Sequence, residues 1–248
     1  MITRLPKPRR FPAGILRAPD PVAGLARRVT AGNGAAYATG AMKRAGVGFR
    51  EHTGWAAMVA LGGGVTAPVV LARSRYELSE GDLPRGVYHA ARQLDLENAG
   101  RLVQEVGLAA RTAAESQLRR TVAELEAAGY EVVGAAVAAP RGLPSDLSEI
   151  LGSHPLVHTA EGQLFRDALA EAAELLGLPV TRFVQHELYD EAADLLGTSA
   201  ASLGAQLTGL GRALGPPWQR DQKEAAAAAW LALAGSGRRT PPELERQD

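Results

Sequence analysis

The chain has 248 residues, of which 46% are hydrophobic and 22% charged, with 27 basic and 27 acidic side chains. This length and composition predict a globular protein of one large domain or two small ones. The absence of cysteine excludes disulfides, thiolate metal sites and cysteine nucleophiles. Because no apolar run could span a membrane and the N-terminus lacks the apolar core of a secretory signal, we expect a cytoplasmic protein without a membrane partner.

Charge is distributed unevenly along the chain. Residues 1–45 contain nine Lys or Arg and a single acid, Asp20, so the remainder has 18 basic and 26 acidic side chains, a net charge of −8. An acidic folded part is not typical of a protein that binds DNA strongly and without sequence preference. A local basic groove remains compatible with this composition.

The segment 1–45 is rich in Pro, Gly, Ala and Arg and has no sustained hydrophobic period, so we predict that it is mostly disordered. Two interpretations stay open. It is either an over-extended start, with Met42 opening the native chain, or a basic arm that contacts nucleic acid or a partner. We expect a single domain over residues 46–235 and a polar tail over 236–248.

The first half of that domain begins with strands. Residues 47–61 read as one long strand and 68–78 as a second, joined through Gly62-Gly63-Gly64 as an antiparallel hairpin. The three glycines lack the Lys-Ser/Thr pair and the following helix of a phosphate loop, which argues against a nucleotide-binding phosphotransferase. A long helix is predicted over 92–128, ended by Gly129. The apolar run 130–139 predicts a strand buried on both faces.

The stretch 153–180 combines two histidines and a carboxylate at the start of a helix. If the helix begins at Pro155, then His154, His158 and Glu161 share one face at i, i+4 and i+7, and Glu161 lies on the apolar stripe. Ionisable groups on a buried face need a partner, a ligand or a metal. Either His158 and Glu161 hydrogen-bond each other or nearby backbone as a cap, or they form a binding site.

The remaining elements alternate strand and helix. We predict a strand over 179–184, helices over 187–196 and 200–214, the second capped by Ser199, and a final alanine-rich helix from Trp218 to Ala234. A hairpin followed by strand–helix alternation predicts an α/β fold with a mixed sheet flanked by helices. Within it we expect Trp55 and Trp230 to be largely buried and Trp218 to be half exposed.

Three short stretches resemble a known superfamily. They are Gly48–Ala56 in the first strand, Ala160-Glu161-Gly162 at a helix start, and Asp221–Ala226 on the final helix. Together with the element order, they resemble the ribonuclease-H-like superfamily, especially the bacterial Holliday-junction resolvases. This resemblance implies carboxylates that hold two divalent ions, Mg2+ or Mn2+, which activate a water and stabilise the leaving oxygen in phosphodiester hydrolysis.

The resemblance implies a candidate catalytic site made of Glu51, Glu161 and Asp221 as metal ligands, with His158 as a further ligand or proton shuttle. Asp221 matches the last-helix carboxylate, although an acid in a first helical turn also suits the helix dipole. The family's first-strand aspartate falls on Arg50, and Glu51, one residue later, points to the opposite face of a strand. The strand 130–139 ends without an acid.

Two functions therefore stay open at this point. One is a divalent-metal-dependent nuclease acting on structured nucleic acid. The other is a non-catalytic member of the same fold that binds a partner, or a small ligand at His154, His158 and Glu161. A homodimer is compatible with both. The observation that separates them is whether Glu51, His158, Glu161 and Asp221 converge in space.

Overall fold

The computed structural model describes residues 42–79 and 81–235, and its centre is a five-stranded sheet in the order β3-β2-β1-β4-β5. The strands β1 (Lys43–His52), β2 (Trp55–Gly64) and β3 (Ala67–Glu77) are antiparallel neighbours. The strand β4 (Tyr130–Ala138) runs parallel to β1, and β5 (Val180–Phe183) runs parallel to β4. The predicted α/β class with a mixed sheet flanked by helices is confirmed.

The predicted long first strand over 47–61 is wrong in one respect, because it is two strands. The chain reverses at Thr53-Gly54, where His52 pairs with Trp55 and Gly54 has a φ of 80°. Glycine adopts this left-handed conformation without a steric penalty, so one glycine inside an apolar run is enough for the turn. Because β1 begins at Lys43, residues 43–45 of the segment predicted to be disordered belong to the sheet. The predictions for residues 1–41 and for the tail lie outside the described residues.

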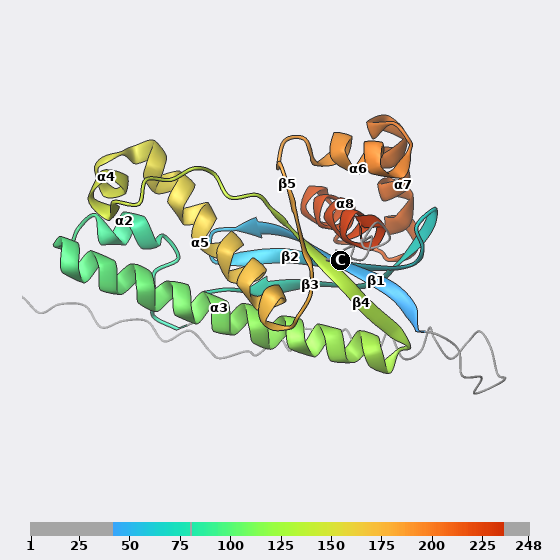
Figure 1. Cartoon of the computed structure of the whole chain (residues 1–248), viewed down its shortest axis with the longest axis horizontal. Helices are drawn as coiled ribbons and strands as arrows, with labels where there is room; N and C mark the ends of the chain where they lie inside the picture. Colours follow the sequence, from blue (N-terminus) through green and yellow to red (C-terminus); the bar gives the residue numbers. More distant parts are fainter. Residues whose placement is uncertain (1–41, 80, 236–248) are drawn as a thin grey trace, which may run out of the picture. The chain divides into compact units, whose positions relative to one another are not determined.

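Four helices follow one another on one side of the sheet (Figure 1): α2 (Val87–Ala91), α3 (Leu96–Ala127), α4 (Leu147–Gly152) and α5 (His154–Leu175). The long helices α3 and α5 bury Leu118 and Phe165 against Phe49 of β1. The predicted helix over 92–128 is confirmed except at its start, where Asp95 caps α3 by accepting a hydrogen bond from the backbone N–H of Asn98 at 2.9 Å.

The other side of the sheet is covered by α8 (Arg220–Gly235) together with α6 (Leu188–Leu196) and α7 (Ala200–Leu210), which continues into the short helix η1 (Gly211–Ala213) (Figure 1). A Cβ atom added to Gly48 of β1 would lie 2.1 Å from the backbone nitrogen of Ala229. The alanines of the last helix therefore let its backbone lie directly against β1. Backbone-to-backbone contact of α8 with β1 places the first turn of α8 beside the end of β1.

The three tryptophans test the sequence predictions at side-chain level. Trp230 is 2% exposed, and its indole Nε1–H donates to the carbonyl of Val65 at 2.8 Å, as expected for a buried residue of the last helix. Trp55 is only partly buried, because it lies near the sheet surface, stacked with the His52 ring and covered by the Arg75 guanidinium. Trp218 is partly exposed, as predicted.

None of the helices in the described part of the chain is long and apolar enough to cross a membrane.

Candidate functional site

The end of β1 carries three consecutive ionisable residues, Arg50, Glu51 and His52. Successive side chains of a strand point to opposite faces. Arg50 and His52 accordingly contact α8, whereas Glu51 contacts α5. This alternation divides the predicted site between the two sides of the sheet.

On the α8 side, two acids lie beside an arginine and a histidine of β1. The Nε atom of Arg50 lies 2.6 Å from Oε2 of Glu224, whose side chain is buried. The other carboxylate oxygen of Glu224, Oε1, lies 2.6 Å from Nε of Arg220. The Nε2 atom of His52 lies 3.1 Å from Oδ1 of Asp221. Asp221 is therefore beside β1, as the resemblance implies. Sequence reasoning missed Glu224, although its position three residues after Asp221 puts it on the same helix face.

On the α5 side, Glu51 is buried and paired with an arginine. The Nε–H of Arg166 donates to Oε1 of Glu51 at 2.7 Å, and both side chains are almost fully buried. Two further atoms, Oε2 of Glu51 and Nη1 of Arg166, are buried without a hydrogen-bond partner in the described chain. A Cβ atom on Gly162 would lie 3.1 Å from Nη2 of Arg166, so this glycine leaves room for the guanidinium. We call Arg50–Glu224, His52–Asp221 and Glu51–Arg166 the sheet-end ion pairs.

The Glu161 carboxylate accepts hydrogen bonds from the N-terminus of α2. Its two carboxylate oxygens accept the backbone N–H groups of Val87 at 3.0 Å, Tyr88 at 2.8 Å and His89 at 3.1 Å. Its Oε1 also lies 3.1 Å from the ring Nδ1 of His89. The predicted cap is therefore right only in part, because the backbone that Glu161 bonds belongs to α2, more than seventy residues away, and His158 pairs with His154 instead. Burial, and then the negative charges of Glu161 and Asp167, raise the pKa of Tyr88.

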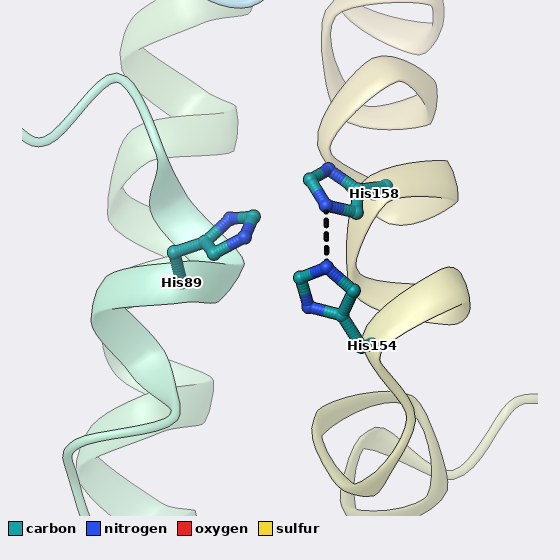
Figure 2. A group of neighbouring side chains, drawn as sticks. All are labelled: His89, His154 and His158. Carbon is teal, nitrogen blue, oxygen red and sulfur yellow. Dashed lines mark hydrogen bonds between the residues drawn. The ribbon is translucent and has the colours of Figure 1, made fainter.

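Three histidines gather where α2 faces the start of α5 (Figure 2). The Nε2 atoms of His154 and His158 are 3.0 Å apart, and the His89 ring centroid lies 4.9 Å from that of His158. The predicted pairing of His154 and His158 on one helix face is thus confirmed. His89 was missed, because it precedes α5 by more than sixty residues and nothing in its own neighbourhood marks it.

The predicted carboxylates do not form a shared centre. Within residues 42–79 and 81–235, the group of three or more His, Asp or Glu whose ligand atoms could hold one ion is His89, His154 and His158. Glu51, Glu161 and Asp221 instead have the separate partners described above. These residues do not fit a two-ion carboxylate centre as they stand, and the catalytic and metal-binding roles of the four candidates stay a prediction.

A groove of about 790 Å3 lies between α3, α5 and the segment after β4. Its wall includes the apolar side chains of Leu108 and Leu164, and the Arg111–Glu171 ion pair, whose atoms are 3.0 Å apart. Arg141, three residues after the carboxyl end of β4, also lines it. In open α/β sheets, ligands bind at the carboxyl ends of the strands.

Comparison with known proteins found no matching family model and no matching curated protein. Two solved structures of Thermus thermophilus RuvC are similar, one of them in complex with a Holliday junction substrate, at 13% identity and a TM-score of 0.44. The other has 12% identity and the same TM-score, and each alignment covers 79% of this chain and 97% of the RuvC chain. The structure itself shows an α/β fold with a five-stranded mixed sheet, and membership of the ribonuclease-H-like superfamily, like kinship with the resolvases, stays a prediction.

Proposed function

We propose that this chain is a non-hydrolytic, ligand-binding protein built on the ribonuclease-H-like fold. One observation carries the proposal. The carboxylates at the end of β1 and the start of α8 have basic partners, with ion-pair distances of 2.6 to 3.1 Å. A two-ion nuclease centre needs carboxylates whose negative charge is available to divalent cations, and arginines offset the charge of Glu51 and Glu224.

Arg50 has the largest influence on the charge that these carboxylates could offer to a divalent cation. It stands at the position where the resemblance implies an aspartate, and its guanidinium remains protonated at any physiological pH. A permanent positive charge 2.6 Å from Glu224 would repel a divalent cation approaching that carboxylate. Hydrolysis through Mg2+ or Mn2+ would therefore require Arg50 to leave Glu224 first.

The groove beside β4 is the place that we assign to the ligand. Its volume of about 790 Å3 falls within the range of small-molecule sites, about 300–1,000 Å3. Apolar side chains alternate with groups that can fix orientation, such as Gln104 and Arg141. The net charge of −8 beyond residue 45 favours a small molecule of mixed polarity over a nucleic acid.

The nuclease alternative is tested by cleavage and metal binding. Four-way DNA junctions are incubated with the wild-type protein and with Asp221→Asn in Mg2+ or Mn2+, and Mn2+ binding is followed by calorimetry. We expect no cleavage, and no Mn2+ binding that depends on Asp221. Cleavage by the wild type that Asp221→Asn abolishes would overturn the proposal in favour of a metal-dependent nuclease.

A gain-of-binding variant sharpens the same test. Arg50→Asp removes the guanidinium and adds a carboxylate opposite Glu224, so it should acquire measurable Mn2+ affinity. Arg50→Gln, which only removes the charge, is the matched control and should gain less. Equal Mn2+ binding by the wild type and Arg50→Asp would contradict the role given to Arg50.

The ligand-binding part is tested by NMR screening of a fragment library against the full chain. We expect chemical-shift changes that cluster at Leu164, Val103 and the other groove residues. Fragment binding elsewhere, with none in the groove, would remove the groove from the proposal.

A further inference from the structure

We infer that His89, His154 and His158 form a binding site for a zinc-class divalent cation, with the fourth coordination position open to water. The site is made by two helices. His154 and His158 lie one turn apart on α5, and His89 faces them from α2 (Figure 2). Of these three residues, only His158 belongs to the candidate catalytic site that the resemblance implies, and none of them lines the groove.

The distances suit a single ion. One ring nitrogen from each histidine lies within 4.8 Å of the other two, and the closest pair, Nε2 of His154 and Nε2 of His158, is 3.0 Å apart. Tetrahedral zinc with Zn–N bonds of about 2.0–2.1 Å separates its nitrogen ligands by roughly 3.4 Å. Small rotations of the exposed imidazole rings are enough to close the remaining difference.

The ligand chemistry selects the class of cation. Neutral imidazole suits Zn2+, Cu2+ and Ni2+, whereas Mg2+ requires oxygen ligands in an octahedral arrangement. In the absence of an ion, the two Nε2 atoms on α5 are close enough for one to donate a hydrogen bond to the other. When an ion binds, the ring that donated this hydrogen bond carries its proton on Nδ1 instead, so that both Nε2 lone pairs are available to the metal.

Glu161 acts on this site as a positioning residue. Its carboxylate lies 3.1 Å from Nδ1 of His89, which must carry the proton of that hydrogen bond, and Nε2 is then the nitrogen left with a lone pair for a ligand. The carboxylate is itself held by three backbone N–H groups of α2. Zinc-binding histidines are commonly oriented through such a carboxylate partner.

The three histidine side chains are exposed, so an ion can reach them from solvent without opening the core. His89 lies in a helix of five residues that contacts α5 through Glu161. An ion bound to all three rings would fasten α2 to α5. Because the unfolded chain lacks this arrangement, binding should raise the melting temperature of the protein.

The experiment uses the full chain without a histidine tag, stripped with EDTA. Competition titration with Zn2+ should give one equivalent bound, and Co2+ should give the visible absorption of a tetrahedral nitrogen site. His158→Ala and His89→Ala should each lose at least about 10-fold in affinity and abolish the thermal shift on Zn2+ addition. His186→Ala is the control, because His186 is exposed and pairs with Glu187 away from this group.

Glu161→Gln should bind Zn2+ about 10- to 100-fold more weakly while keeping the tetrahedral Co2+ spectrum, because the three ligands remain. Circular dichroism of each variant checks that it is folded. If Glu161→Gln does not fold, His89→Ala still decides, since it leaves the three backbone bonds to Glu161 intact. Zn2+ affinity that is absent in the wild type, or unchanged in both His89→Ala and His158→Ala, would overturn the inference.

Discussion

The sheet-end ion pairs and the three-histidine group are both clusters of ionisable side chains, but they differ in how their charges are matched. In the first, Glu51 and Glu224 are buried, and arginines lie within 2.7 Å of their carboxylates. In the second, three imidazole side chains lie together at the surface, and the Nε2 atoms of His154 and His158 are 3.0 Å apart. Acids that are paired with arginines have little remaining affinity for a cation, whereas a group of imidazoles without such cations keeps its affinity.

Glu161 differs from the acids of the sheet-end ion pairs in having backbone groups as its main partners. Its carboxylate is saturated by backbone N–H groups, which supply partial positive charge without a counter-ion. The residue therefore supports the histidine group through His89. Four experiments on stability test the comparison, from the largest expected effect to the smallest.

The largest effect is expected from Arg166→Met. This variant leaves the Glu51 carboxylate buried without its cation, which should lower the free energy of unfolding by about 4 kcal/mol in urea denaturation. The exposed pair Arg101–Glu97 provides the control, and Arg101→Met should cost less than about 0.5 kcal/mol. Similar losses in both variants would mean that the buried Glu51–Arg166 pair contributes no more to stability than an exposed ion pair.

The contact that brings α8 onto β1 should be nearly as sensitive. In Gly48→Ala, the new Cβ would meet the backbone of Ala225 and Ala229 at 2.1 to 2.2 Å, and we expect a loss of about 3 kcal/mol. Gly64→Ala adds the same methyl group where no atom lies within 4 Å, and should change stability by less than about 0.5 kcal/mol. Thermal unfolding of both variants measures the contrast, and a tolerated Gly48→Ala would show that α8 can move away from the sheet.

The histidine group should contribute little to stability when no metal is present. Replacing His89, His154 and His158 together with alanine should cost less than about 1 kcal/mol in EDTA, since all three are exposed. A loss as large as that of Arg166→Met would mean that the histidines are structural in the same sense as the sheet-end ion pairs. Chemical denaturation in EDTA makes the two measurements directly comparable.

The smallest effect concerns Tyr88, next to His89. Burial, Glu161 and Asp167 raise its pKa in the folded state, so the folded protein holds the phenol proton more tightly than the unfolded chain, whose tyrosine pKa is about 10. This contribution to stability is complete below pH 10 and is lost as the pH rises through the folded-state pKa. Tyr88→Phe should therefore have a flatter dependence of stability on pH above 10. An unchanged slope would contradict the raised pKa.

Much of the fold followed from local patterns. The apolar run 130–139 is β4, the periodic segment after Pro155 is α5, and the serine at 199 caps α7 by accepting the backbone N–H of Ser202 at 3.2 Å. These elements were predictable because hydrophobic period and capping are properties of adjacent residues. The turn at Gly54 was not, because one glycine in an apolar run looks the same inside a strand as between two.

By itself, the sequence determined most of the longer elements, the burial of Glu161 and the shared face of His154 and His158, since each depends on spacing within one element. It did not mark the division of β1 from β2 or the short helices α2 and α4. Only the tertiary structure decided the partners. Arg166 meets Glu51 across 115 residues, and Glu161 meets His89 across 72. Contacts of this kind arise from packing of elements distant in the chain, which spacing does not encode. The same packing placed His89 opposite α5.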